Sequence, residues 1–131
     1  MRIVSTYAAL LALLFVFLSI RTIRLRRRLQ IAIGHREDER MLRAMRVHAN
    51  FAEYAPFALL LIAFVELGAA PQLLVHALAS LLVLGRLSHA WGVSQLKEDY
   101  RFRVAGMAMT FTSILLAAAW LLYHAVFMPL A

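Results

Sequence analysis

The sequence contains no cysteine, and this absence excludes disulfide bonds and any thiol nucleophile supplied by the protein. Thiol chemistry at this protein would therefore need a substrate that carries the thiol. Acidic residues are also scarce, with seven Asp and Glu against 14 Lys and Arg and a formal net charge of +7. This excess does not predict nucleic-acid binding, because the arginines lie in short segments between apolar runs and are typical of membrane-topology signals.

Long polar stretches are missing as well. Hydrophobic residues make up 63% of the 131 residues, and the mean hydropathy is +0.76. A soluble protein of this size would expose too much apolar surface, so the expected solvent is a lipid bilayer. The length predicts a single domain, residues 1–131.

Four apolar segments predict an all-α membrane protein, a bundle of four transmembrane helices. The run from Ile3 to Ile20 carries no charge and exceeds the apolar core of a signal peptide, about 7–15 residues, so we expect it to remain as the first helix. Each segment approaches or exceeds the roughly 20 residues that cross a bilayer. The predicted helices cover about residues 3–23, 41–68, 71–95 and 102–127.

The charges between these segments predict the orientation of the chain. The first and third connectors are rich in Arg and Lys, whereas the turn from Gly68 to Pro71 and the C-terminal tail carry no charge. The positive-inside rule then places both basic connectors in the cytoplasm and both termini on the other side of an inner or cell membrane. Glu66, near the far interface, is expected to be solvated.

Polar residues concentrate at the start of the second segment. Arg46, Asn50 and Glu53 follow the spacing i, i+4 and i+7, which places them on one helix face, and Tyr54 flanks that face. Polar side chains in a membrane helix are costly and often mark a functional site. Alternatively, Arg46 extends to the lipid headgroups and Asn50 bonds a neighbouring helix.

The third segment contributes Arg86 and His89, which share a face at i and i+3. Glu53 and Arg86 lie at comparable depths in their helices, so we expect them to form an ion pair, because either charge alone would be expensive in the membrane. Such a pair either fixes the helix packing only or also holds a ligand. No group of histidines has metal-ligand spacing with carboxylate support, so no metal site is predicted.

Arg103 opens the fourth segment, where an arginine either anchors the helix at the interface or stabilises an anion such as a thiolate. Arg101 competes for the second role. The arginines of residues 21–28 are mainly topology signals, although one or two could reach a ligand. Together these residues predict a cytoplasm-facing pocket for an anionic, partly peptide-like ligand beside a lipophilic partner.

The pattern Arg46-x-x-x-Asn50-x-x-Glu53-Tyr54-x-Pro56 resembles the second helix of the MAPEG family, the membrane-associated proteins in eicosanoid and glutathione metabolism. The segments Gly85-Arg86-Leu87-Ser88-His89 and Phe102-Arg103-Val104-Ala105-Gly106-Met107 are similar to its third and fourth helices. Val93 departs from the pattern, because eukaryotic members carry a pocket tyrosine there.

The resemblance implies a homotrimer that binds glutathione as a co-substrate between subunits, in contact with membrane lipids and lipophilic small molecules. It implies that Arg103 is the catalytic, thiolate-stabilising residue. It also implies a set of glutathione-binding residues. The first helix contributes the candidates Arg26 and Arg27, and the second and third helices contribute Arg46, Asn50, Glu53, Tyr54, Arg86 and His89.

Three functions follow as hypotheses. The leading one is a membrane-embedded glutathione transferase or peroxidase that directs the thiolate to lipophilic electrophiles. The alternative is a non-catalytic lipid-binding or scaffold protein of the same fold. A small proton-coupled exporter is disfavoured, because it depends on an acidic residue in the first helix and Ile3–Ile20 has none.

Overall fold

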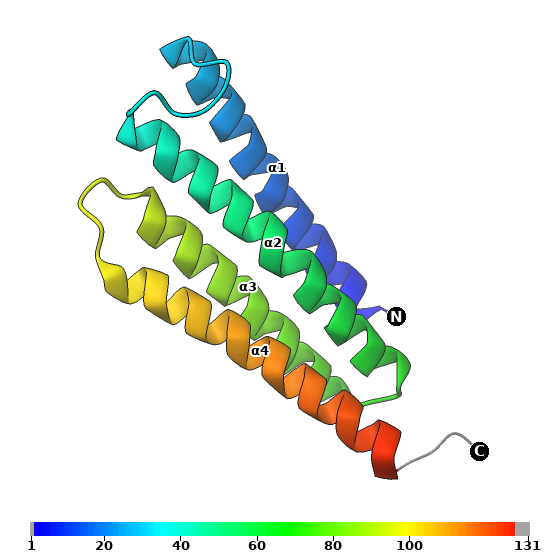
Figure 1. The fold of residues 1–131 in the computed structure, drawn as a ribbon. Coiled ribbons are helices and arrows are strands. Elements are labelled where there is room, and N and C mark those ends of the chain that lie inside the picture. Colours follow the sequence, from blue (N-terminus) through cyan, green and yellow to red (C-terminus); the bar gives the residue numbers. More distant parts are fainter. Residues whose placement is uncertain (1, 128–131) are drawn as a thin grey trace.

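The computed structural model describes residues 2–127, which form four helices. The helices lie side by side along one long direction, and the α1–α2 and α3–α4 connectors meet at the same end (Figure 1). The tight α2–α3 turn lies at the opposite end, which we call the far end. The prediction of an all-α four-helix architecture is confirmed. The helices are α1 (Ile3–Leu29), α2 (Glu39–Leu67), α3 (Gln72–Ser94) and α4 (Tyr100–Phe127).

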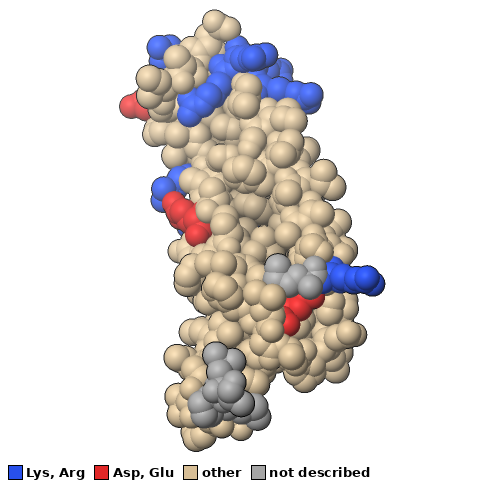
Figure 2. Space-filling model, turned by 90° about the vertical axis from the view of Figure 1, so that its right-hand side faces the viewer, with Lys and Arg blue, Asp and Glu red and all other residues tan. Residues whose placement is uncertain are grey.

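The outside of the bundle is suited to lipid. Each of the four helices is long and apolar enough to span a membrane, and large apolar side chains such as Leu13, Leu73 and Leu115 are exposed around it. Lys and Arg gather at the connector end in Figure 2, above a broad surface with few charges. This distribution is expected of a protein whose apolar lateral surface lies in a bilayer.

Several helix ends differ from the predicted boundaries, most of them by one or two residues, and two of these differences have a local cause. α1 continues to Leu29 and not to residue 23, because the basic side chains of its last turn favour the negative end of the helix dipole. Gln30 then ends the helix in a left-handed conformation, φ 54°. α2 begins at Glu39, where the Asp38 side chain accepts a hydrogen bond from Met41 N at 3.0 Å. The hydrogen bond from the Arg40 side chain lowers the pKa of Asp38.

The core forms along a stripe of α2 that meets the other helices. Its buried members, from Val47 to Val65, recur at three- or four-residue intervals, so they occupy one face of the helix. Small residues among them, including Ala55 and Ala58, allow the neighbouring helices to approach. The opposite face of α2 is thereby turned outward along most of its length.

Glycines bring α3 and α4 into close backbone contact. A Cβ added to Gly106 would lie 2.5 Å from His89 N, and one added to Gly85 would lie 2.9 Å from the Gly106 carbonyl oxygen. Ser113 Oγ also donates to the Leu78 carbonyl oxygen at 2.9 Å. Small residues and interhelical hydrogen bonds are the usual means of packing helices in lipid. This packing fixes α4 against the part of α3 that carries Arg86 and His89.

Glu66 has a structural role at the far end, and the prediction that it is merely solvated is wrong. Its carboxylate accepts hydrogen bonds from Ile3 N at 3.1 Å and Val4 N at 2.9 Å. The first backbone N–H groups of a helix have no partner within the helix, so an acidic side chain from α2 satisfies them and favours the positive end of the α1 dipole.

Candidate functional site

The polar face of α2 opens into a cavity of about 100 Å³ near the connector end. Arg46, Asn50 and Glu53 line it together, which confirms that they share one face. His89 contributes from α3 and Arg103 from α4, and Ala49 and Val93 complete the wall. Residues that are far apart in the sequence therefore converge, and two arginines, one carboxylate, one amide and one imidazole meet in a small volume.

Arg86 lies behind this cavity, and its side chain is fully committed to neutral partners. It is 1% exposed. Its guanidinium donates to Asn50 Oδ1 at 2.7 Å from Nη1 and to Thr110 Oγ1 at 3.1 Å from Nε and 2.7 Å from Nη2. It also lies 5.9 Å from the centre of the Tyr54 ring. These contacts stabilise a buried cation through hydrogen bonds and the face of an aromatic ring.

The predicted ion pair between Glu53 and Arg86 is therefore wrong. Glu53 is exposed at the cavity, whereas Asn50 faces Arg86. Similar depth along two helices does not decide which faces meet, because that depends on the rotation of each helix about its axis. Thr110 from α4, which accepts two of the hydrogen bonds of the Arg86 guanidinium, was missed. The available signal was a hydroxyl residue one turn after Gly106, the first of three Ser and Thr residues in this helix, with Thr112 and Ser113.

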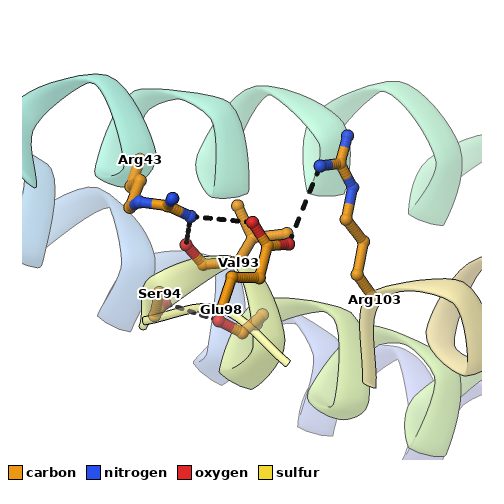
Figure 3. Close-up of polar contacts among 6 residues, drawn as sticks. Arg43, Val93, Ser94, Glu98 and Arg103 are labelled. Carbon is orange, nitrogen blue, oxygen red and sulfur yellow. Dashed lines mark hydrogen bonds and ion pairs between the residues drawn. The ribbon is translucent and has the colours of Figure 1, made fainter. Parts of the chain in front are cut away.

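A second residue that sequence reasoning missed is Glu98, in the connector before α4. Its side chain is 6% exposed and lies 2.9 Å from Arg43 and 3.7 Å from Arg103 (Figure 3). Arg43 also donates to the Val93 carbonyl oxygen at 3.2 Å, near the end of α3. In the sequence Glu98 is one of several charged residues in a short connector, and no local pattern showed that it folds inward toward α2.

Arg103 lines a second cavity in addition to the first. This neighbouring cavity measures about 300 Å³ and shares Arg46, Val93 and Arg103 with the smaller one. Arg101 lines neither, and its backbone N–H bonds Asp99 Oδ1 at 3.0 Å at the start of α4. The structure thus brings Arg103, and not Arg101, to the polar face of α2. Together the cavities reach the size range of small-molecule sites, about 300–1,000 Å³.

The remaining predicted residues lie outside the cavity. Arg26 donates to three carbonyl oxygens of the first connector, at 3.1 to 3.4 Å, and it lines a separate cavity with Arg27. Within one chain, neither residue reaches the α2 face. Tyr54 is half-buried, with its ring against Phe111 at 5.5 Å and near Arg86, so it supports the site from behind.

A larger cavity of about 480 Å³ lies elsewhere at the connector end. Its charged lining consists of Arg21, Arg24, Arg28 and Arg40, with Ser94 the other polar residue. Without a carboxylate or an amide in the lining, it offers fewer means to orient a peptide-like ligand. We therefore place the candidate site at the cavity of Arg46, Asn50, Glu53 and Arg103.

The fold and this site define an integral membrane protein with four spanning helices and a polar pocket near the connector end. The chain matches the model of the MAPEG family over residues 4–123. It is 35% identical to the inner membrane protein YecN of Escherichia coli strain K12 over 112 residues, which are 86% of this chain and 84% of YecN. The protein of that name from Escherichia coli O6:H1 strain CFT073 matches equally. No solved structure matches. The chain belongs to the MAPEG family.

Proposed function

We propose that this protein is a membrane-embedded glutathione transferase or peroxidase that stabilises the glutathione thiolate for attack on lipophilic electrophiles. The observation that carries the proposal is the convergence of Arg46, Asn50, Glu53, His89 and Arg103 on one cavity. The absence of cysteine adds support, because a thiol reaction here needs a thiol from the substrate. Membership of a family that includes glutathione transferases supports the same choice of thiol.

The binding groups match the chemistry of glutathione. Its carboxylates suit Arg46, and its ammonium group suits Glu53, which is exposed at the cavity. Asn50 accepts from Arg86 through Oδ1, so its amide N–H groups are the ones left for a peptide carbonyl. In this arrangement Arg86 and Tyr54 act as positioning residues behind Asn50.

Arg103 is the proposed catalytic residue. Its permanently charged guanidinium favours the thiolate over the thiol, so the thiol releases its proton to solvent at a lower pH. The sulfur then forms a bond to the electrophilic carbon of the acceptor while the leaving group departs with its electron pair. The exposed apolar sides of the helices let a lipophilic acceptor approach from the bilayer.

We also propose the assembly and orientation that the family resemblance implies. In a homotrimer, Arg26 or Arg27 of one subunit would reach the glutathione of its neighbour, which accounts for their distance from the cavity within one chain. Both basic connectors face the cytoplasm by the positive-inside rule. The membrane is the inner membrane, by analogy with the name of the E. coli relative.

The function is tested with purified protein, glutathione and a chlorinated aromatic acceptor. The wild type should form the thioether conjugate and show thiolate absorbance when glutathione binds. Arg103→Ala should lower turnover by about 100-fold, the usual cost of losing one donor to a developing anion. Arg101→Ala is the matched control and should retain turnover. Equal turnover of wild type and Arg103→Ala would remove Arg103 from the mechanism, and a lack of thiolate in the wild type would reject the proposed chemistry.

A non-catalytic lipid-binding or scaffold function is the second candidate. The observation that favours it is Val93, which lines the cavity where eukaryotic family members carry a tyrosine, so no hydroxyl is available there. This function predicts lipid binding without conjugate formation. Thioether formation by the wild type would reject it as the main function.

A further inference from the structure

Glu98 is a buried carboxylate whose two oxygen atoms differ in their surroundings. Oε2 accepts a hydrogen bond from Arg43 at 2.9 Å. Oε1 is buried and has no hydrogen-bond partner among the described residues, and Arg103 Nη1 lies 3.7 Å away from it. A buried oxygen without a donor is costly and rare in native proteins, so this atom needs an explanation.

The two arginines beside Glu98 are held very differently (Figure 3). Arg43 is fixed, because it bonds both Glu98 and the Val93 carbonyl oxygen, and its side chain is 23% exposed. Arg103 approaches Glu98 beyond hydrogen-bond distance, and its side chain is 52% exposed. Glu98 is thus anchored through Arg43, whereas its contact with the Arg103 guanidinium is longer and more exposed.

Arg103 also lines both cavities of the candidate site, so a bound anion and Glu98 would compete for the same guanidinium. We propose that Glu98 is an internal counter-anion that holds Arg103 in the empty site and that a bound anionic ligand must displace. Glu98 is thereby a positioning residue that limits how strongly Arg103 stabilises a negative ligand. The inference rests on the proposed function for the identity of that ligand, the glutathione thiolate.

Glu98 has a second electrostatic consequence for the thiolate. Its negative charge disfavours a second negative charge nearby, so it raises the pKa of a thiol bound beside it. A charge within about 4–6 Å typically shifts the pKa of a neighbouring group by about 1–3 units. Arg43 offsets part of this effect, because it neutralises Glu98 from the other side. The charged or titratable groups that line these cavities besides Glu98 and Arg103 are Glu39, Arg43, Arg46 and Glu53 from α2, His89 from α3 and Tyr100 from α4.

The variant Glu98→Gln tests the proposal, since it keeps the shape and an acceptor for Arg43 but removes the charge. The midpoint of thiolate formation by bound glutathione, followed by absorbance against pH, should fall by about 1 pH unit. Asp99→Asn is the matched control, because Asp99 is an exposed neighbouring carboxylate and asparagine can keep its bond to Arg101 N. An unchanged or raised midpoint in Glu98→Gln would overturn the proposal.

A second measurement needs no glutathione. Phenylglyoxal modifies arginine more slowly when a carboxylate pairs with the guanidinium, and peptide mass spectrometry reports the rate at each site. Arg103 should react several-fold faster in Glu98→Gln than in wild type or Asp99→Asn, with Arg101 as the internal reference. Equal rates would overturn the counter-anion role. Faster labelling with no thiolate in any variant would keep that role and reject the proposed function.

Glu98→Asp covers the case in which Glu98→Gln does not fold. The shorter side chain keeps the charge and the link to α2 but moves the carboxylate away from Arg103. Labelling of Arg103 should then increase less than in Glu98→Gln, and the midpoint should fall by a smaller amount. Wild-type values for both measurements would contradict the proposal.

Discussion

Arg86 and Arg103 are both arginines, but they lie in two regions of the molecule with opposite surroundings. Around Arg86, the middle of the bundle supplies Asn50 and Thr110 as acceptors and leaves the side chain 1% exposed. At the connector end, Arg103 is 52% exposed and lies 3.7 Å from its nearest carboxylate. Hydrogen bonds to buried acceptors give Arg86 a structural role. The longer and more exposed contact of Arg103 leaves its guanidinium accessible to a ligand.

The largest expected effect is on stability and comes from Arg86→Ala. The change removes the guanidinium that bonds both Asn50 and Thr110 and leaves a cavity between them. The free energy of unfolding should therefore fall by about 4 kcal/mol. Thermal unfolding in detergent micelles measures it. A loss below about 1 kcal/mol would show that Arg86 does not hold the bundle together.

Arg103→Ala should show the reverse behaviour. Its roughly 100-fold loss of turnover corresponds to about 2.7 kcal/mol of transition-state stabilisation, whereas its effect on unfolding should stay within about 0.5 kcal/mol, as is usual for exposed side chains. Turnover and thermal unfolding are measured on the same preparation. A large loss of stability without a loss of turnover would show that Arg103 has a structural role and not a catalytic one.

Gly106→Val tests the close backbone packing between α3 and α4. The added side chain would meet the backbone of His89, and overpacking of this kind costs about 2 kcal/mol. Ala105→Val is the control, because Ala105 is exposed on the same helix. If both variants unfold at the wild-type temperature, close glycine packing is not what positions the Arg86 region.

The smallest effect is expected at the far end, from Glu66→Gln. Glutamine can still accept a hydrogen bond from the first turn of α1 but loses the favourable charge, so the expected loss is about 0.5 kcal/mol. Glu53→Gln is the matched control, because Glu53 is exposed and should leave unfolding unchanged. Hydrogen exchange at Ile3 and Val4 provides a local measurement, and equal protection in both variants would argue against the cap.

The helices and the polar face of α2 were predictable because both depend on local sequence. A run of about 20 apolar residues indicates a span wherever its neighbours lie, and helical periodicity alone places Arg46, Asn50 and Glu53 together. The partner of Arg86 was not predictable in this way. It required knowing which face of α2 meets α3, and the pairing with Glu53 failed for that reason.

The sequence by itself therefore determined four membrane-spanning helices, a basic connector end and a polar stripe on α2, because hydropathy, charge and periodicity are properties of short segments. Only the tertiary structure decided that Asn50 and Thr110 satisfy Arg86, because Gly85 and Gly106 let α3 and α4 approach closely. It also decided that Glu98 folds under α2 between Arg43 and Arg103. These contacts join residues from separate helices, and their geometry depends on how whole helices pack and rotate.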